Sequence, residues 1–150
     1  MMRVVLQRVL QASVQINSKE HGKIGKGILV FLGVGKDDKL EDAVYLAEKI
    51  VNVRIFPDQY DKMNHSLAQV GGEILVVSQF TLWGDCRKGR RPSYAEAAPP
   101  EYARSLYEYF VDRLRQHSIP VQTGKFQEMM HVHLINDGPV TLLLDSRKEF

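Results

Sequence analysis

Residues 25–56, "GKGILVFLGVGKDDKLEDAVYLAEKIVNVRIF", decide the fold class, because the spacing of their apolar residues changes partway along. Residues 25–34 are a continuous apolar run between glycines, which is typical of a short strand covered on both faces. From residue 37 onward the apolar residues recur as on one face of an amphipathic helix, with Asp38 and Glu41 spaced as a capping pair. The apolar stripe of this helix consists of Ala43, Leu46, Ala47, Ile50 and Val51.

The rest of the chain alternates between further strands and one more main helix. Apolar and polar residues alternate strictly from Leu10 to Asn17, which predicts a half-buried strand. Residues 71–84, "GGEILVVSQFTLWG", predict a buried strand with β-forming residues through Leu82. Residues 119–124, 126–136 and 139–145 read as strands, so we expect an α/β fold. The second helix is predicted in residues 99–117, with the apolar stripe Ala103, Leu106, Tyr107, Phe110 and Leu114.

Length and composition are those of an ordinary globular protein. With 150 residues, 44% of them hydrophobic and 25% charged, the chain is expected to form a single domain, residues 1–150. The single cysteine, Cys86, fits a reducing compartment. Arg3 and Arg8 interrupt the N-terminal apolar segment, and no apolar run is long enough to span a bilayer. We therefore expect a soluble, cytoplasmic protein that does not associate with membranes.

Common cofactor and metal motifs are absent. The sequence contains no P-loop, no Rossmann glycine fingerprint, no HExxH and no CxxC, so we expect no cofactor and no metal. His131 and His133 alternate on one strand face, where two solvated polar residues are a more ordinary interpretation than a shared metal. Cys86 lies beside Arg87 and Lys88, a setting that favours a thiolate nucleophile, although no partner histidine is identifiable. A thiol-dependent hydrolase is therefore one alternative.

A basic segment is the first candidate for ligand binding. Arg87, Lys88, Arg90 and Arg91 fall within five positions of a loop rich in glycine and proline. Such a cluster suits phosphate oxygens, which arginine forks recognise, and a solvated run of charges is the equally common alternative.

The end of the predicted buried strand, "SQFTL" at residues 78–82, is a candidate for catalysis. Ser78 and Thr81 supply hydroxyl groups and Gln79 an amide, next to backbone N–H groups at the point where a strand leaves the core. A strand end holds such donors rigidly, which suits the stabilisation of an oxyanion. Strands also end in polar residues for solubility alone, so the motif by itself is weak.

Residues 136–141, "NDGPVT", lie between two stretches with strand character. Asp-Gly is a strong hairpin signal, but Pro139 has no N–H for a ladder and restricts Gly138 before it. The pattern predicts a hairpin turn and leaves open whether the Gly-Pro pair serves a ligand.

Three segments together, "VVSQFTL" (76–82), "GDCRKGRRPS" (84–93) and "LINDGPVT" (134–141), resemble the D-aminoacyl-tRNA deacylases. The resemblance extends from "VVLQRV" through "RIFPD" and "LYEYFV" to "PVTLLLDS". It implies a three-layer α/β subunit with mixed β-sheets and two main helices, in a homodimer with its active site at the subunit interface. It also implies a carboxylic ester hydrolase that removes D-amino acids, or mischarged glycine, from tRNA and rejects L-aminoacyl-tRNA. A non-catalytic RNA-binding dimer of the same fold is the alternative.

The resemblance also implies a role for individual residues. The catalytic residues would be Ser78, Gln79, Phe80 and Thr81. Substrate binding and chiral selection would fall to Gly138 and Pro139, joined by a cis peptide bond, and to Asn136, Arg8, Phe126 and Met130. Gly138 and Pro139 would reach the site of the partner subunit, and Arg8 would brace their loop. The basic segment of Arg87, Lys88, Arg90 and Arg91 would contact tRNA phosphates.

The chain departs from the family pattern near the expected pocket entrance. The family's Phe-Gly-Ala-x-Met pattern is "FQEMM" here, so Gln127 and Glu128 replace small residues, and Trp83 stands where a tyrosine is common. Two mechanisms stay open. In one, Thr81 is the nucleophile and Gln79 with backbone N–H groups stabilises the oxyanion. In the other, which we favour because no histidine or lysine is placed to activate Thr81, the ribose 2′-hydroxyl assists the attack of water.

Overall fold

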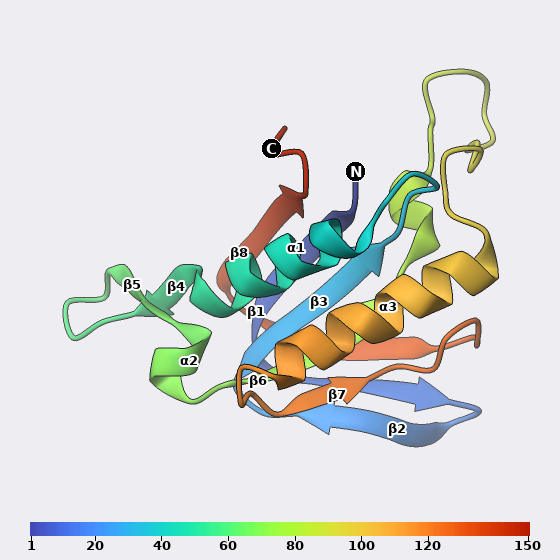
Figure 1. Ribbon diagram of the computed structural model, residues 1–150. Helices are drawn as coiled ribbons and strands as arrows, with labels where there is room; N and C mark the ends of the chain where they lie inside the picture. The colour runs from blue at the N-terminus through green and yellow to red at the C-terminus, as the bar shows by residue number, and fades with distance from the viewer.

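The computed structural model describes residues 1–150, which form a six-stranded mixed sheet flanked by helices (Figure 1). The sheet order is β2-β1-β3-β6-β7, and β8 pairs with β1. β1 is antiparallel to β2, β3 and β8, whereas β6 is parallel to β3 and β7. The strands are β1 (Arg3–Ile16), β2 (Lys19–Ile24), β3 (Gly27–Gly33), β6 (Glu73–Ser78), β7 (Val121–Thr123) and β8 (His131–Asp145). The predicted α/β class is confirmed.

Two long helices, α1 (Leu40–Asn52) and α3 (Pro100–Arg115), lie on one face of the sheet (Figure 1). Every residue of both predicted apolar stripes is buried, so these helix predictions are confirmed. The stripes pack against Val4, Leu6, Ile28, Val30 and Ile74 in the larger hydrophobic core. None of the helices has the length and apolar character needed to cross a membrane.

A second, smaller core covers the opposite face of β3 and β6. Successive strand residues point to opposite faces, so Leu29 and Leu75 lie in this core while Ile28 and Ile74 face the helices. The second core is closed by Val14 and by other residues from the C-terminal half of β1 and from β2, with the beginning of β8 packed against it. β1 therefore passes from one layer into the next, and the three layers implied by the resemblance are present.

A two-stranded arm, formed by β4 (Arg54–Pro57) and β5 (Met63–Ser66), projects from one side of the molecule (Figure 1). The short helix α2 (Leu67–Val70) comes directly after it, with Ser66 as its N-cap. Neither β5 nor α2 is indicated by the apolar spacing of the sequence. Their four-residue lengths give too few positions for a periodic pattern.

The predicted hairpin at residues 136–141 is wrong, because β8 runs through this segment without reversing. Gln7 is paired with Thr141 and Val9 with Asn136, so residues 137–140 stand opposite Arg8 alone. We call these four residues the Gly-Pro bulge. Pairing with β1 on both sides of the bulge outweighs the local Asp-Gly turn signal, which depends on two residues only.

Other boundaries also differ from the predictions. β6 ends at Ser78, and the β-forming residues after it make the 3₁₀ helix η1 (Phe80–Trp83). The predicted strand over residues 126–136 begins only at His131. Leu10 begins the apolar side of the predicted half-buried strand, yet it is 51% exposed. The β1–β8 register shifts between Val9 and Gln11 and leaves Leu10 as an extra bulge residue.

The predicted capping pair of α1 is displaced by one residue. The N-cap is Lys39, whose N–H donates to Asp42 Oδ2 at 2.7 Å. Asp38 instead accepts from the N–H of Gly35 at 2.6 Å and pairs with the N-terminal ammonium, also at 2.6 Å. Asp38 is fully buried, and this burial raises its pKa above the ordinary value, while the two contacts act in the opposite direction.

Candidate active site

The end of β6 presents backbone N–H groups that the fold does not use. Gln79 continues the sheet, since its N–H donates to the carbonyl of Leu32 at 2.8 Å. The chain then turns into η1, where the N–H of Leu82 donates to the carbonyl of Gln79 at 3.2 Å. Phe80 and Thr81 are the first two residues of η1, so their N–H groups have no acceptor within this helix, and they donate to no side chain or loop carbonyl. The strand end therefore offers two adjacent donors.

A cavity of about 840 Å³, the η1 cavity, opens beside this strand end. Ser78, Gln79 and Phe80 form one wall, as expected for a site at the end of a buried strand. The segment of residues 126–130, including Phe126 and Met130, forms another wall. Hydrophobic residues make up 11 of the 16 that line the cavity, so it has the size and polarity of a small-molecule site.

Thr81 lies next to this wall without lining the cavity itself. Its hydroxyl oxygen accepts a hydrogen bond from the side-chain Nε2 of Gln79. No histidine, lysine or carboxylate is hydrogen-bonded to Thr81, so no side chain is placed to remove its proton. The structure thus brings Ser78, Gln79, Phe80 and Thr81 together, and it shows no activated nucleophile among them.

The wall of residues 126–130 is held from two sides. The ring of Phe126 packs on Tyr107 with 5.8 Å between centroids, and the guanidinium of Arg104 lies 4.9 Å from its centre. Met130 Sδ accepts from the N–H of Lys125 at 3.4 Å. Gln127, which stands where the deacylase pattern has glycine, has a φ of 62°, in the left-handed region that glycine favours. The backbone path suited to glycine is therefore kept despite the larger residue.

The remaining wall comes from residues that the sequence patterns did not indicate. Tyr94 packs edge-on against Phe80 with 4.9 Å between ring centroids, and both line the cavity. Ala97 and Ala103, near the start of α3, complete this side. Tyr94 and Ala97 lie in an irregular loop, which has no periodic signal, and Ala103 was predicted only as part of the helix core.

The Gly-Pro bulge is held by the side chain of Asn136. Asn136 Oδ1 accepts from the N–H of Val140 at 2.7 Å, and its Nδ2 donates to Thr141 Oγ1 at 3.2 Å and to the carbonyl of Val140 at 3.3 Å. The Gly138–Pro139 peptide is cis, as the resemblance implied. Gly138 has a φ of 140°, and a Cβ there would lie 2.7 Å from Val140 Cγ2, so only glycine fits.

Arg8 supports the bulge from beneath. Its side chain is buried, and its Nε donates to the carbonyl of Asp137 at 2.9 Å and lies 3.4 Å from the carboxylate of the same residue. Its Nη1 donates to the carbonyl of Ile55 in β4. Arg8 therefore ties the backbone just before Gly138 to the two-stranded arm.

The bulge and the η1 cavity are separate within one chain. None of Arg8, Asn136, Gly138 and Pro139 lines the cavity. The surface around the bulge is apolar for an exposed strand pair, since Leu10, Ile135 and Leu143 are 51%, 46% and 52% exposed. Exposed large apolar residues on strands that flank such a bulge suit an interaction site.

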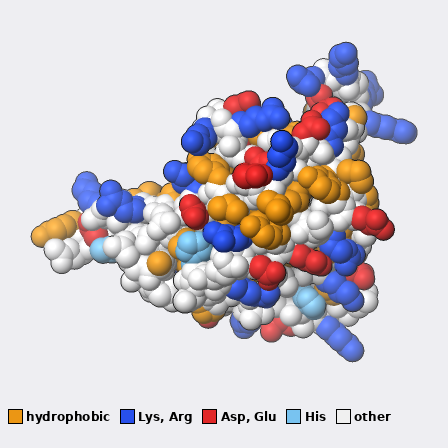
Figure 2. Space-filling view, viewed as in Figure 1, with side chains coloured by type: hydrophobic (Ala, Val, Ile, Leu, Met, Phe, Trp, Pro, Cys, Tyr) orange, Lys and Arg blue, Asp and Glu red, His pale blue; other side chains and the backbone are white.

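The basic loop, residues 85–93, projects from the body between η1 and α3 (Figure 1). Two hydrogen bonds between the backbones of Asp85 and Ser93, of 2.8 and 2.9 Å, close its base. Arg87 pairs with Asp85 at 2.7 Å, and this hydrogen-bonded guanidinium lowers the pKa of Asp85 to about 2. Lys88, Arg90 and Arg91 form no ion pair, and Figure 2 shows Lys and Arg side chains gathered at this projection.

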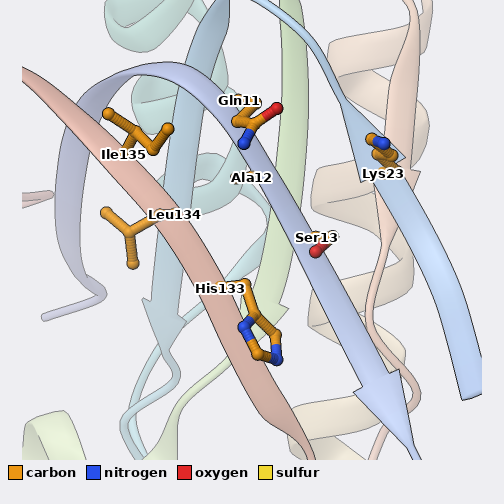
Figure 3. A pocket seen from close by; sticks show the side chains of 7 residues that line it. All are labelled: Gln11, Ala12, Ser13, Lys23, His133, Leu134 and Ile135. Carbon is orange, nitrogen blue, oxygen red and sulfur yellow. The ribbon is translucent and has the colours of Figure 1, made fainter. Parts of the chain in front are cut away.

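A second, smaller hollow of about 150 Å³ lies on the outer surface of β1, β2 and β8 (Figure 3). Ser13 stands directly opposite His133 on one side and Lys23 on the other. His131 and His133 are exposed, and no group of three or more metal-ligating side chains is present. Because the hollow contains none of the predicted catalytic residues, the η1 cavity is the better candidate.

Comparison with known proteins identifies the family. The sequence model described as D-Tyr-tRNA(Tyr) deacylase matches residues 5–145. The chain belongs to this family. A D-aminoacyl-tRNA deacylase of Syntrophobacter fumaroxidans is 69% identical over 99% of the chain and 100% of the relative, and one of Thermosipho africanus is 60% identical with the same coverage. Deacylases are hydrolases, and the chain is therefore an enzyme of this class.

A solved structure extends the comparison within the deacylase fold. The protein titled c-Myc DNA Unwinding Element Binding Protein superposes with a TM-score of 0.90 and 38% identity, over 95% of this chain and 97% of that chain.

Proposed function

We propose that this editing hydrolase cleaves the ester between a D-amino acid, or glycine, and the terminal ribose of tRNA, and leaves L-aminoacyl esters intact. The observation that carries the proposal is the η1 cavity, where an apolar pocket meets two free N–H groups at a rigid strand end. The aminoacylated 3′ end of tRNA enters this cavity and places its ester carbonyl beside Phe80 and Thr81.

Catalysis in this cavity depends on positioning and on stabilisation of charge. Water attacks the ester carbonyl carbon, the N–H groups of Phe80 and Thr81 donate to the developing oxyanion, and the bond to the ribose oxygen breaks. The ribose oxygen takes up a proton, and the amino acid leaves with the oxygen of water. The ribose 2′-hydroxyl assists the attack, which is consistent with the lack of a base at Thr81.

Chiral selection requires a second copy of the chain. Gly138 and Pro139 lie outside the η1 cavity of their own chain, and the exposed apolar residues around their bulge suit burial in a homodimer. Carbonyl groups of the partner's bulge bind the α-amino group of the substrate and leave no space for an L side chain. Rejecting the L form roughly a thousandfold takes about 4 kcal/mol, which a steric clash with a rigid backbone supplies. Glycine has no side chain to clash and is accepted.

The basic loop supplies the contact with the tRNA backbone. Lys88, Arg90 and Arg91 are unpaired, so they are free to bind phosphate oxygens, while Arg87 is held by Asp85. As an enzyme that acts on charged tRNA, the chain would work in the cytoplasm, as one domain over residues 1–150.

A deacylation assay tests the function. The purified protein is mixed with D-Tyr-tRNA, Gly-tRNA and L-Tyr-tRNA, and release of the amino acid is measured. We expect D-tyrosine and glycine to be released and L-tyrosine to be released roughly a thousandfold more slowly. Similar rates for the two tyrosine enantiomers would overturn the proposed selection.

A subunit-mixing experiment tests the shared site. Gln79→Ala alters the cavity wall, and Gly138→Ala alters the bulge. Each homodimer is expected to be nearly inactive on D-Tyr-tRNA, whereas a mixed dimer holds one site with both native parts. After random exchange, about a quarter of wild-type activity should return. No recovery in dimers shown by native mass spectrometry to be mixed would place both residues in the same chain's site.

A second function is favoured by one observation. The solved relative at 38% identity is named for binding a DNA unwinding element, and this chain has three unpaired cations on its basic loop. In this alternative, the protein binds nucleic acid and catalyses no reaction. This alternative predicts that the protein binds uncharged tRNA or DNA and releases no amino acid from any of the three charged tRNAs.

A further inference from the structure

Arg3, at the start of β1, contacts η1 in two ways. Its Nη1 donates to the carbonyl of Leu82 at 2.9 Å. Its guanidinium carbon lies 4.0 Å from the centre of the Trp83 ring, in cation–π geometry. Arg3 therefore holds both the backbone and the side chain of the last turn of η1.

η1 also packs closely on two glycines of the β3 region. A Cβ at Gly33 would lie 2.9 Å from Leu82 Cβ, and one at Gly35 would lie 2.4 Å from Trp83 Cζ2. η1 therefore packs into a space that only glycine leaves open. Gly33 is also the direct cross-strand partner of Arg3, so the glycine and the arginine contact η1 side by side from neighbouring strands.

These contacts of Arg3 and the two glycines set the orientation of the candidate oxyanion donors. The N–H of Leu82 donates to the carbonyl of Gln79, and its own carbonyl is held by Arg3. Between these two bonds lie Phe80 and Thr81, whose N–H groups are free. A donor pair contributes to catalysis only if its direction is fixed before the reaction, so the residue that fixes η1 governs the rate.

The contact is kept at a cost in stability. Arg3 Nε and Trp83 Nε1 are both buried without a hydrogen-bond partner. A buried donor without a partner destabilises the folded state, because it loses its hydrogen bond to water and gains none in return. Unpaired buried donors of this kind call for a specific explanation, and a functional site is one of the recognised reasons.

We infer that Arg3 is a positioning residue of the deacylase, which holds η1 so that the N–H groups of Phe80 and Thr81 face the substrate ester. The inference rests on the proposed function of the η1 cavity. Arg3 does not line that cavity, so it acts through η1 and not by touching the substrate.

The test compares Arg3→Met, Arg3→Lys and the control Arg147→Met, an exposed arginine whose side chain makes no polar contact. We expect Arg3→Met to lower kcat for D-Tyr-tRNA at least tenfold, with KM within about twofold, because positioning is lost and tRNA contact is not. Arg3→Lys keeps a donor for the Leu82 carbonyl and should recover part of kcat. Arg147→Met should behave as wild type.

Trp83 is the only tryptophan and gives a second readout that is independent of activity. Loss of Arg3 should shift its fluorescence emission to longer wavelength and increase quenching by acrylamide, while far-ultraviolet circular dichroism stays unchanged. If Arg3→Met does not fold, Arg3→Lys and Trp83→Phe carry the kcat comparison.

The outcomes separate the two claims. An inactive wild-type protein would overturn the proposed function of the cavity. An active wild type with an equally active Arg3→Met, or with a raised KM and unchanged kcat, would overturn the role of Arg3. A lowered kcat without any change in Trp83 emission would also contradict it, because η1 would not have moved.

Discussion

Gln79 donates its side-chain N–H to the hydroxyl oxygen of Thr81, and this bond decides how the two residues are used. A hydroxyl that only accepts a hydrogen bond is not activated as a nucleophile, since activation needs an acceptor for its proton. The amide of Gln79, in turn, is oriented by Thr81 at the edge of the cavity. The pair is therefore suited to shaping the site.

Thr81→Ala is expected to reduce kcat by less than about tenfold, because the backbone N–H of residue 81 remains. Single-turnover deacylation of D-Tyr-tRNA measures this, with intact-mass spectrometry of the quenched wild-type enzyme beside it. Complete loss of activity together with an acylated Thr81 would establish Thr81 as the nucleophile.

Asn136→Ala removes the acceptor for the N–H of Val140 and two donated hydrogen bonds. We expect the free energy of unfolding to fall by about 1–3 kcal/mol and the preference for D- over L-Tyr-tRNA to weaken, because the bulge is no longer fixed. Gln122→Ala, an exposed residue of β7, is the control. Unchanged enantiomer preference in a destabilised Asn136→Ala would show that the bulge does not select.

In the basic loop, replacing unpaired arginines should affect the salt dependence of tRNA binding more than replacing the paired Arg87. Replacing Arg90 and Arg91 with glutamine should weaken tRNA binding and reduce the slope of log affinity against log salt by roughly 1–2. Arg87→Gln should change the slope less, because Arg87 is neutralised by Asp85. Equal slopes in all three proteins would remove the loop from the tRNA contact.

Gln127 adopts a backbone conformation that costs most residues about 1–2 kcal/mol and glycine almost nothing. Gln127→Gly should therefore leave the unfolding free energy unchanged or raise it by up to about 1 kcal/mol. The β-branched Gln127→Val should lower it. Urea unfolding measures both, and a clear loss of stability in the glycine variant would contradict the left-handed conformation.

Ionisation of Tyr107 is expected to contribute to the loss of unfolding free energy at alkaline pH. Burial raises its pKa from 10.0 to about 12. The folded protein thus holds this proton more tightly than the unfolded chain, so the stabilisation is complete below pH 10 and is lost as the pH rises towards 12. In Tyr107→Phe the unfolding free energy should fall less steeply over this range. An identical pH profile would exclude Tyr107 as a cause.

The sequence predicted those elements in which apolar residues recur at regular spacing. Both main helices carry five-residue stripes whose members are all buried, because a long amphipathic pattern leaves few alternatives. A buried strand reaching Ser78 was also predicted. The 3₁₀ helix η1 was not predicted, because it forms by packing on Gly33 and Gly35, which are distant in sequence.

The candidate site was predictable only where its residues belong to a short sequence motif. Motif resemblance indicated Ser78 through Thr81 and the Gly-Pro pair, whereas Tyr94 and Arg3 enter the site region through contacts across the fold. The hairpin prediction failed because two residues of turn signal competed with strand pairing on both sides. Local patterns describe elements, and the contacts between distant elements complete the site.

The pairing of β8 with β1 on both sides of the Gly-Pro bulge has a consequence for how this enzyme can change over evolution. The proposed selector is main chain held between two paired segments of β8, so it keeps its shape when side chains that line the η1 cavity are replaced. Point mutations in the cavity would then alter which amino acids are cleaved quickly without reversing handedness. Inversion of enantiomer preference would require an insertion or deletion in β8, which is a much rarer event.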